Sequence, residues 1–266
     1  MAQDETQNDT QQTNTGEPRF RTYVINLDRS TDRWARICQS FATVPECQVI
    51  RISAVDVQSQ PEYTRRPHCS AFGFLWRMGR KARPQEIGCY TSHLRAIRDF
   101  LDSGEPWALI CEDDVVPTAQ LPEILNWLTE HSDEWELVRL ARCREKDFHP
   151  LQKLPTGNTL GVNIGGFSYA PAYLLNRRGA ERLLRRIACM KLPFDLALYH
   201  GWRGVREFSL LPPALTMNEL SNESTLGRKK HAWYDVFFIP SKLFCKIWMR
   251  AVRGTFQRIR LHQRHS

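Results

Sequence analysis

One stretch of the sequence constrains the fold more than any other, because an apolar run ends abruptly in three consecutive acids. The run is Ala108-Leu109-Ile110-Cys111, and the acids are Glu112-Asp113-Asp114. Trp107 precedes the run, and Val115-Val116-Pro117 follows the acids. A short apolar run with such boundaries predicts a buried β-strand that carries the three carboxylates at its C-terminal end.

Three adjacent carboxylates repel one another, so a chain tolerates them best where a positive charge lies among them. A divalent metal ion with oxygen ligands is the usual source of that charge. In open α/β sheets, the C-terminal edge of the strands is also where ligands bind. The stretch is therefore interpreted as a metal and phosphate site, with a solvated acidic turn as the alternative.

Charge is distributed unevenly along the chain of 266 residues, whose net charge is +8. Residues 1–18 hold four acids and no Lys or Arg, whereas residues 228–266 hold ten Lys or Arg and one acid. The basic excess is thus mostly C-terminal, which argues against a nucleic-acid-binding domain as the main function. A hydrophobic content of 42% suits a globular domain with a sizeable core.

The two ends differ in composition from the part between them. Residues 1–18 are polar without apolar periodicity, which predicts a disordered tail. Residues 228–266 interleave aromatic and basic side chains, and Pro240 interrupts them. Such a segment predicts binding to an anionic membrane surface, with a terminal helix packed on the domain as the alternative. The globular domain is expected over residues 19–227.

The eight cysteines form no CxxC pair, and no Cys/His set has zinc-finger spacing. Cys89 and Cys111 fall in predicted core elements, where a thiol packs as a small apolar group. We expect a reducing compartment. Neither a signal peptide nor an apolar run of eighteen residues is recognisable. The expected location is cytoplasmic, peripheral on the inner face of the cytoplasmic membrane.

A strand at 21–27, a helix from Ser30 or Thr31 to about Phe41 and a strand at 47–56 are predicted next. They place four polar side chains near one sheet edge: Asn26, Arg29, Arg33 and Asp56. Arginines there suit a diphosphate, because a guanidinium binds phosphate oxygens in pairs. Asp56 suits a ribose or a base. The alternatives are a solvated helix face and a turn-forming Asp.

Residues 57–85 are basic and aromatic without a clear period, which predicts a long functional loop over a sugar or a phosphate. A helix over 86–102 follows, and His93 lies on its apolar flank. Beyond the acids, we expect helices at 121–131 and 171–188, strands at 136–141, 163–170 and 207–211, and a surface loop at 143–160. Strands that alternate with helices predict a mixed α/β sheet.

Several motifs occur together in one order. They are Tyr23-Val24-Ile25-Asn26-Leu27-Asp28-Arg29 with Arg33, Ala54-Val55-Asp56, Glu86-Ile87-Gly88-Cys89-Tyr90-Thr91-Ser92-His93, Ile110-Cys111-Glu112-Asp113-Asp114, Gly166-Phe167-Ser168-Tyr169-Ala170 and Pro193-Phe194-Asp195. In this order and spacing the chain resembles glycosyltransferase family 25, of the lipooligosaccharide galactosyltransferase type, over roughly 21–226.

The resemblance implies a GT-A-like (Rossmann-like) fold with a mixed central sheet, a UDP-sugar donor and Mn²⁺ or Mg²⁺. It implies inverting transfer of a hexose, with galactose from UDP-galactose favoured over other hexoses, onto a lipid-linked lipopolysaccharide or lipooligosaccharide or another glycan acceptor. It also implies roles for particular residues: Glu112 and Asp114 at the metal, Arg29 and Arg33 at the diphosphate, Asn26 and Asp56 at the nucleoside, Ser92 and His93 in the donor site, and Asp195 as the general base, with Asp113 or Glu112 as alternatives.

The sequence differs from the family pattern at two positions, and two other functions are alternatives to this interpretation. Gln85 stands where the family has Gly, and Glu112 replaces the first Asp of a DxD-like pair. A nucleotidyltransferase is one rival, although Asp28-Arg29-Ser30 lacks the glycines of a phosphate-binding loop. The other rival is a non-catalytic glycan-binding or scaffold protein on the same fold.

Overall fold

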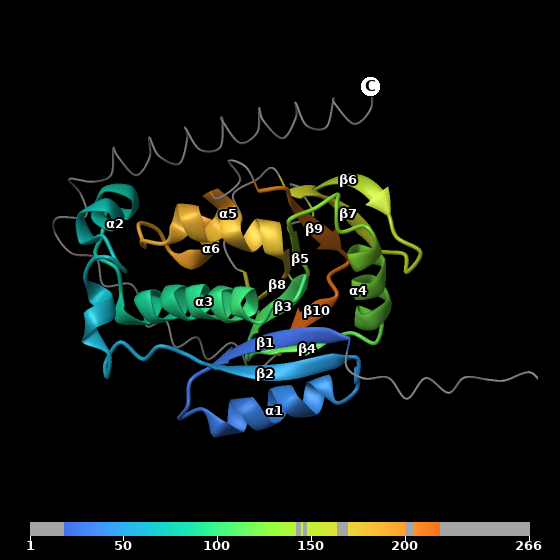
Figure 1. Ribbon diagram of the computed structural model, residues 1–266, viewed down its shortest axis with the longest axis horizontal. Helices are drawn as coiled ribbons and strands as arrows, with labels where there is room; N and C mark the ends of the chain where they lie inside the picture. The colour runs from blue at the N-terminus through green and yellow to red at the C-terminus, as the bar shows by residue number, and fades with distance from the viewer. Residues whose placement is uncertain (1–18, 142–144, 146–147, 164–169, 201–204, 219–266) are drawn as a thin grey trace, which may run out of the picture.

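A mixed eight-stranded sheet forms the centre of the computed structural model (Figure 1). The structure describes residues 19–141, 145, 148–163, 170–200 and 205–218. The strands are β1 (Phe20–Asn26), β2 (Cys47–Ser53), β3 (Trp107–Glu112), β5 (Leu137–Arg139), β6 (Phe148–Lys153), β7 (Thr159–Asn163), β8 (Ala172–Asn176) and β9 (Glu207–Leu211). Their order across the sheet is β2-β1-β3-β8-β5-β9-β7-β6. A separate antiparallel pair joins β4 (Val115–Pro117) to β10 (Leu215–Met217).

Helices cover both faces of the sheet. They are α1 (Thr31–Phe41), α2 (Ala71–Met78), α3 (Pro84–Asp102), α4 (Leu121–Glu130), α5 (Arg177–Ile187) and α6 (Phe194–His200), with a short 3₁₀ helix at Pro61–Thr64. Apolar side chains of α3, α5 and α6 form one core cluster, and those of α1 and α4 form another on the opposite face. The buried sheet between two helical layers confirms the mixed α/β, GT-A-like class expected from the sequence.

The first three strands decide where the site lies. β1 is parallel to β2 on one side and to β3 on the other, so their carboxyl ends meet at one edge. Asn26 pairs with Ser53 across the first ladder, and Ile25 pairs with Glu112 across the second. The polar residues that follow each strand are therefore neighbours, although up to 87 positions separate them in sequence.

Some sequence-based boundaries were wrong. The helix expected over 171–188 begins only at Arg177, because residues Ala172–Asn176 form the central strand β8. All five of these residues are buried, and a short run that is buried throughout does not distinguish strand from helix by its period. Asn176 then caps α5 by accepting a 2.8 Å hydrogen bond from the Gly179 backbone amide.

Two expected loops also contain regular structure. The region 143–160 holds β6 and the start of β7, and the region 57–85 holds the 3₁₀ helix and α2. Most of the strand expected at 163–170, and both tails, lie outside the described residues. Among the described helices, none combines the length and the apolar character needed to cross a membrane.

Candidate active site

The three acids do not share one environment. Asp113 lies under two donors: the Asn26 side-chain amide donates a 2.6 Å hydrogen bond to its Oδ2, and Arg33 Nη2 lies 2.6 Å from its Oδ1. The same Arg33 nitrogen is 3.7 Å from Asp114 Oδ2. Arg33 therefore compensates the negative charge of Asp113 more than that of Asp114.

Asp114 is the acid whose charge is least compensated. Burial, followed by the nearby charge of Glu112, raises its pKa to about 7. Its Oδ1 atom is buried without a hydrogen-bond partner among the described residues. A divalent cation would supply both the missing partner and the missing charge, and hard cations prefer carboxylate oxygens. The residues present at Asp114 therefore fit the ion that the resemblance implies.

Glu112 points toward a different neighbourhood from Asp113 and Asp114. Its Oε1 atom lies 3.5 Å from His93 Nε2 and 3.9 Å from Cys89 Sγ, both on α3. Cys89 is exposed, so the prediction that it packs in the core was wrong, whereas Cys111 is buried as expected.

Asn26 is held in place by Arg51, a residue whose role was not predicted from the sequence. Arg51 donates 2.6 Å and 3.1 Å hydrogen bonds to Asn26 Oδ1, and its guanidinium lies 5.1 Å from the centre of the Trp34 ring. Asn26 is only 1% exposed, and its amide orients Asp113. A contact between Asn26 and a nucleoside stays a prediction. A charged residue within a strand, as Arg51 is in β2, was the available sequence signal.

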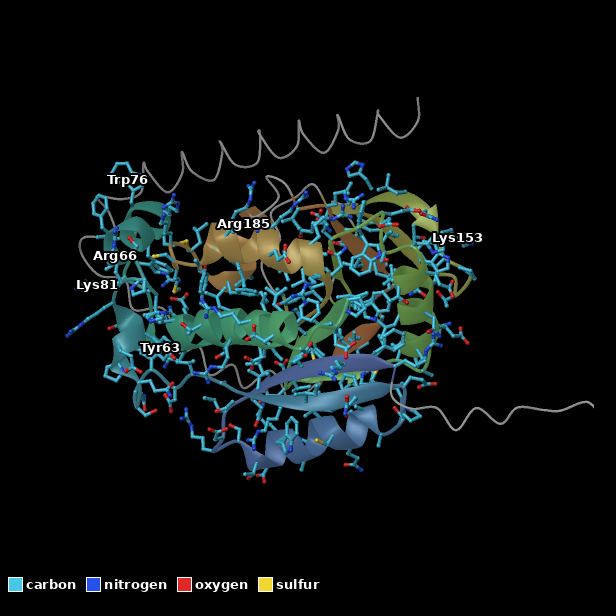
Figure 2. The ribbon with its side chains drawn as sticks, in the orientation of Figure 1. Tyr63, Arg66, Trp76, Lys81, Lys153 and Arg185 are labelled. Atoms are coloured by element: carbon cyan, nitrogen blue, oxygen red, sulfur yellow. The ribbon has the colours of Figure 1, made fainter. Side chains whose placement is uncertain are left out.

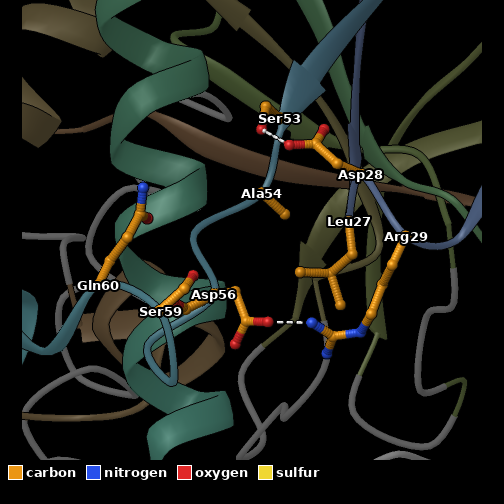
Figure 3. A pocket seen from close by; sticks show the side chains of 8 residues that line it. All are labelled: Leu27, Asp28, Arg29, Ser53, Ala54, Asp56, Ser59 and Gln60. Carbon is orange, nitrogen blue, oxygen red and sulfur yellow. Dashed lines mark hydrogen bonds and ion pairs between the residues drawn. The ribbon is translucent and has the colours of Figure 1, made fainter.

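A pocket of ≈ 240 Å³ opens beside this cluster, where β1 and β2 end (Figure 3). It is lined by Leu27, Asp28, Arg29, Ser53, Ala54, Asp56, Ser59 and Gln60. Arg29 forms an ion pair with Asp56 across the opening. The hydrogen bond that the guanidinium donates within this pair lowers the pKa of Asp56. Ser53 Oγ donates a 2.7 Å hydrogen bond to Asp28 Oδ2. The structure thus brings together Arg29 and Asp56, which the sequence placed at this edge.

Helix α3 fixes the segment that carries Asp56. The Ser92 hydroxyl donates a 2.6 Å hydrogen bond to the Gly88 carbonyl and accepts a 2.8 Å bond from the Val55 amide. A Cβ atom at Gly88 would lie 2.5 Å from the Val55 carbonyl oxygen, so only glycine allows this approach. Gly88 and Ser92 therefore position the loop that forms one wall of the pocket. Ser92 is itself fully buried.

Asp195 lies in the first turn of α6. Its Oδ1 accepts a 2.8 Å hydrogen bond from the Leu196 amide. Burial raises the pKa of Asp195, and the nearby charges of Glu112 and Glu86 raise it further. Residues 112 and 195 are thus close enough in space for the charge of Glu112 to act on Asp195, and the role of Asp195 as general base stays a prediction.

Comparison with known proteins agrees with this arrangement. Residues 20–198 match glycosyltransferase family 25, whose description reads LPS biosynthesis protein. The chain belongs to glycosyltransferase family 25. The matched region contains the whole edge described above, from β1 to Asp195.

Three similar proteins in this comparison are procollagen galactosyltransferases. Procollagen galactosyltransferase 1 of Danio rerio is 23% identical over 245 residues, which cover 85% of this chain and 39% of that protein. Procollagen galactosyltransferase 2 is 27% identical over 180 residues in Mus musculus and 25% identical over 179 residues in Homo sapiens. Each match to the mouse and human proteins covers 61% of this chain and 27% of the relative. The chain thus spans less than half the length of these relatives.

Proposed function

We propose that this family 25 chain transfers galactose from UDP-galactose to a glycan acceptor in a metal-dependent, inverting reaction. The observation that carries the proposal is Asp114, a mostly buried carboxylate with an unpartnered oxygen and a pKa raised to about 7, at the same sheet edge as the pocket at the ends of β1 and β2. The name galactosyltransferase, which the relatives bear, supports galactose as the sugar.

The donor would extend from the pocket to the acids. Asp56 and the pocket wall take the nucleoside, with Asn26 behind them, and Arg29 and Arg33 face the diphosphate. Negative charge develops on the diphosphate as the bond to galactose breaks, and guanidinium groups held in place stabilise it. A divalent ion, Mn²⁺ or Mg²⁺, held by Asp114 with Glu112 would add Lewis-acid stabilisation of the same charge.

Inversion needs one base that removes the proton of the attacking acceptor hydroxyl. Asp195 is the proposed base for two reasons. Burial raises its pKa, and it does not form the hydrogen bond to Asn26 and the ion pair with Arg33 that hold Asp113. The hydroxyl oxygen attacks the anomeric carbon from the face opposite the UDP, and its proton passes to the Asp195 carboxylate. Glu112 is the alternative base.

The acceptor is proposed to be a lipid-linked lipopolysaccharide or lipooligosaccharide, in line with the description of the family. The region 57–85 is the proposed acceptor surface. There Phe72 is 73% exposed, Trp76 is 51% exposed, and the two rings stack with their centres 6.4 Å apart. Trp76 and Arg66 lie at the outer end of the molecule, around α2 (Figure 2). The proposed location stays cytoplasmic and membrane-peripheral, through a tail outside the described residues.

The test is a donor panel. UDP release from UDP-galactose, UDP-glucose and UDP-N-acetylglucosamine is measured with Mn²⁺ and with EDTA, first alone and then with truncated lipooligosaccharide or procollagen peptides. We expect metal-dependent release from UDP-galactose that lipooligosaccharide accelerates. Acceleration by the peptide alone would replace the proposed acceptor. An absence of both release and nucleotide binding would favour the scaffold interpretation.

A further inference from the structure

Three side chains with metal-binding atoms converge between α3 and the end of β3. Cys89 and His93 are one helical turn apart, so both project from the same face of α3, and Glu112 faces them from the sheet. Cys89 Sγ, His93 Nε2 and a Glu112 oxygen all lie within 4.8 Å of one another. Asp113 and Asp114, which contact Arg33, are not members of this group.

The spacing is close to that of a tetrahedral zinc centre. Zinc bonds of about 2.3 Å to sulfur and about 2.0–2.1 Å to nitrogen and oxygen place the ligand atoms roughly 3.4–3.6 Å apart. Glu112 Oε1 lies 3.5 Å from His93 Nε2 and 3.9 Å from Cys89 Sγ. The Cys89 sulfur lies slightly beyond this range from Glu112, and a change in the Cys89 χ1 angle would bring it closer.

The packing and the hydrogen bond of His93 suit a metal ligand. The side chain is 1% exposed, and its ring lies flat on Phe194, with 3.9 Å between centres and 1° between planes. Its Nδ1 atom is 3.1 Å from the Tyr173 hydroxyl. If Nδ1 carries the hydrogen and Tyr173 accepts it, the Nε2 lone pair points toward Glu112. Ligating histidines are commonly held by such a bond through their second nitrogen.

The Nε2 atom has no satisfactory partner of its own. It is buried without a hydrogen bond among the described residues, and its 3.5 Å separation from Glu112 exceeds the 2.7–3.2 Å of an ordinary N–H···O bond. A buried polar atom that lacks a partner is costly. An ion between Nε2 and Glu112 would remove that cost. A protonated His93 paired with Glu112 is the competing explanation.

We propose that Cys89, His93 and Glu112 form a three-ligand site for Zn²⁺ or a similar borderline-soft ion. Thiolate and imidazole ligands select such ions over Mg²⁺ and Mn²⁺, which prefer the all-oxygen environment at Asp114. Three protein ligands leave the fourth position to water or a bound molecule. An ion here would hold Glu112 toward α3, so the Mn²⁺ or Mg²⁺ ion of the proposed reaction would then be held by Asp114 without Glu112, and Glu112 would no longer be available as the alternative base. The proposal does not depend on the transferase function.

The test uses the full chain, stripped with EDTA and returned to excess Mg²⁺. Zn²⁺ is measured by equilibrium dialysis, and Co²⁺ is added as a spectroscopic probe whose thiolate bond gives a near-ultraviolet charge-transfer band. We expect one tightly bound equivalent and a Co²⁺ band. Cys89→Ser should abolish the band and weaken Zn²⁺ binding about tenfold or more, and Tyr173→Phe should weaken binding while keeping the band. Cys38→Ser, a change of a half-buried thiol on α1, is the matched control.

Two results would overturn the proposal. One is an absence of stoichiometric Zn²⁺ binding, which would leave the His93–Glu112 ion pair as the explanation. The other is a Co²⁺ band that survives in Cys89→Ser, which would place the thiolate ligand elsewhere. Because Cys89 is exposed, its replacement by Ser is expected to fold, and circular dichroism checks this. Zn²⁺ binding and the Co²⁺ band are both measured without UDP-galactose turnover. A protein that lacks transferase activity could therefore still pass or fail this test.

Discussion

The side-chain amide of Asn26 donates a 2.6 Å hydrogen bond to Asp113, and this contact gives the three consecutive acids different roles. With Asn26 on one oxygen and Arg33 on the other, Asp113 is satisfied by the protein itself. Asp114 lacks that support and has a pKa of about 7. The end of β1 thereby determines which acid after β3 keeps an unpartnered oxygen for the proposed cation.

Removal of this amide should disturb the acids without removing any of them. In Asn26→Ala, Asp113 loses one of its two donors, and Arg51 loses the Asn26 oxygen and keeps only its longer hydrogen bonds to backbone carbonyls. We expect a loss of about 1–3 kcal/mol in the free energy of unfolding. Metal-dependent UDP release should also fall. Denaturant unfolding and initial rates measure the two effects, and full activity in the variant would contradict the role given to Asn26.

The raised pKa of Asp114 predicts how stability depends on pH. A carboxyl whose folded pKa lies above its unfolded value stabilises the fold when protonated, and that contribution is lost as pH rises toward 7. Asp114→Asn removes the cost of burying a charged carboxylate at high pH. The free energy of unfolding of the metal-free variant should therefore exceed that of the wild type at pH 8 by roughly 1–3 kcal/mol. The two should converge near pH 4. Urea unfolding in EDTA at both values is the measurement, with the exposed Asp133→Asn as control.

Added Mn²⁺ should reverse the difference in stability between Asp114→Asn and the wild type at pH 8. The ion competes with the proton for Asp114, so it should stabilise the wild type more at pH 8 than at pH 5. It should stabilise Asp114→Asn much less. Equal stabilisation of the two proteins would show that the ion binds elsewhere.

The Arg29–Asp56 pair should matter for the donor and little for the fold. Arg29 is exposed, and exposed ion pairs contribute little to stability. In Arg29→Ala we expect a higher KM for UDP-galactose, by about tenfold, with an unchanged melting temperature. Arg21→Ala, which breaks a 3.0 Å exposed pair with Glu105, is the matched control and should leave KM unchanged. A shift in KM of the same size in both variants would remove Arg29 from the donor site.

Gly88→Ala tests whether α3 positions the pocket wall. The added methyl group would meet the Val55 carbonyl at 2.5 Å, so helix and loop must separate. Overpacking of this kind costs about 1–3 kcal/mol. The KM for the donor should rise because Asp56 moves with Val55. Ser92→Ala, which removes the hydroxyl's hydrogen bonds to Val55 and Gly88 without adding bulk, should produce a smaller change in the same direction.

The sequence predicted this edge because local rules govern it. Parallel strands end at one edge, so Arg29, Asp56 and Asp114 could be placed together from the positions of β1, β2 and β3 alone. The helix expected over 86–102 was confirmed as Pro84–Asp102 because its apolar stripe is long and regular. These predictions needed no knowledge of packing.

Other parts depended on packing across the chain. The strand β8 could not be distinguished from the start of α5, since five buried residues have no informative period. The partners of His93 come from positions 80 and 101 residues further along, Tyr173 and Phe194, and no local pattern predicts either contact. The assignment of Asn26 to Asp113 likewise required the β1–β3 register.

The most direct test of the account is calorimetric binding of UDP to the wild type, Asp114→Asn and Asp133→Asn, each with Mn²⁺ and with EDTA. Mn²⁺ should strengthen UDP binding in the wild type and in Asp133→Asn, and this gain should disappear in Asp114→Asn. UDP binding that responds equally to Mn²⁺ in all three proteins would contradict this expectation.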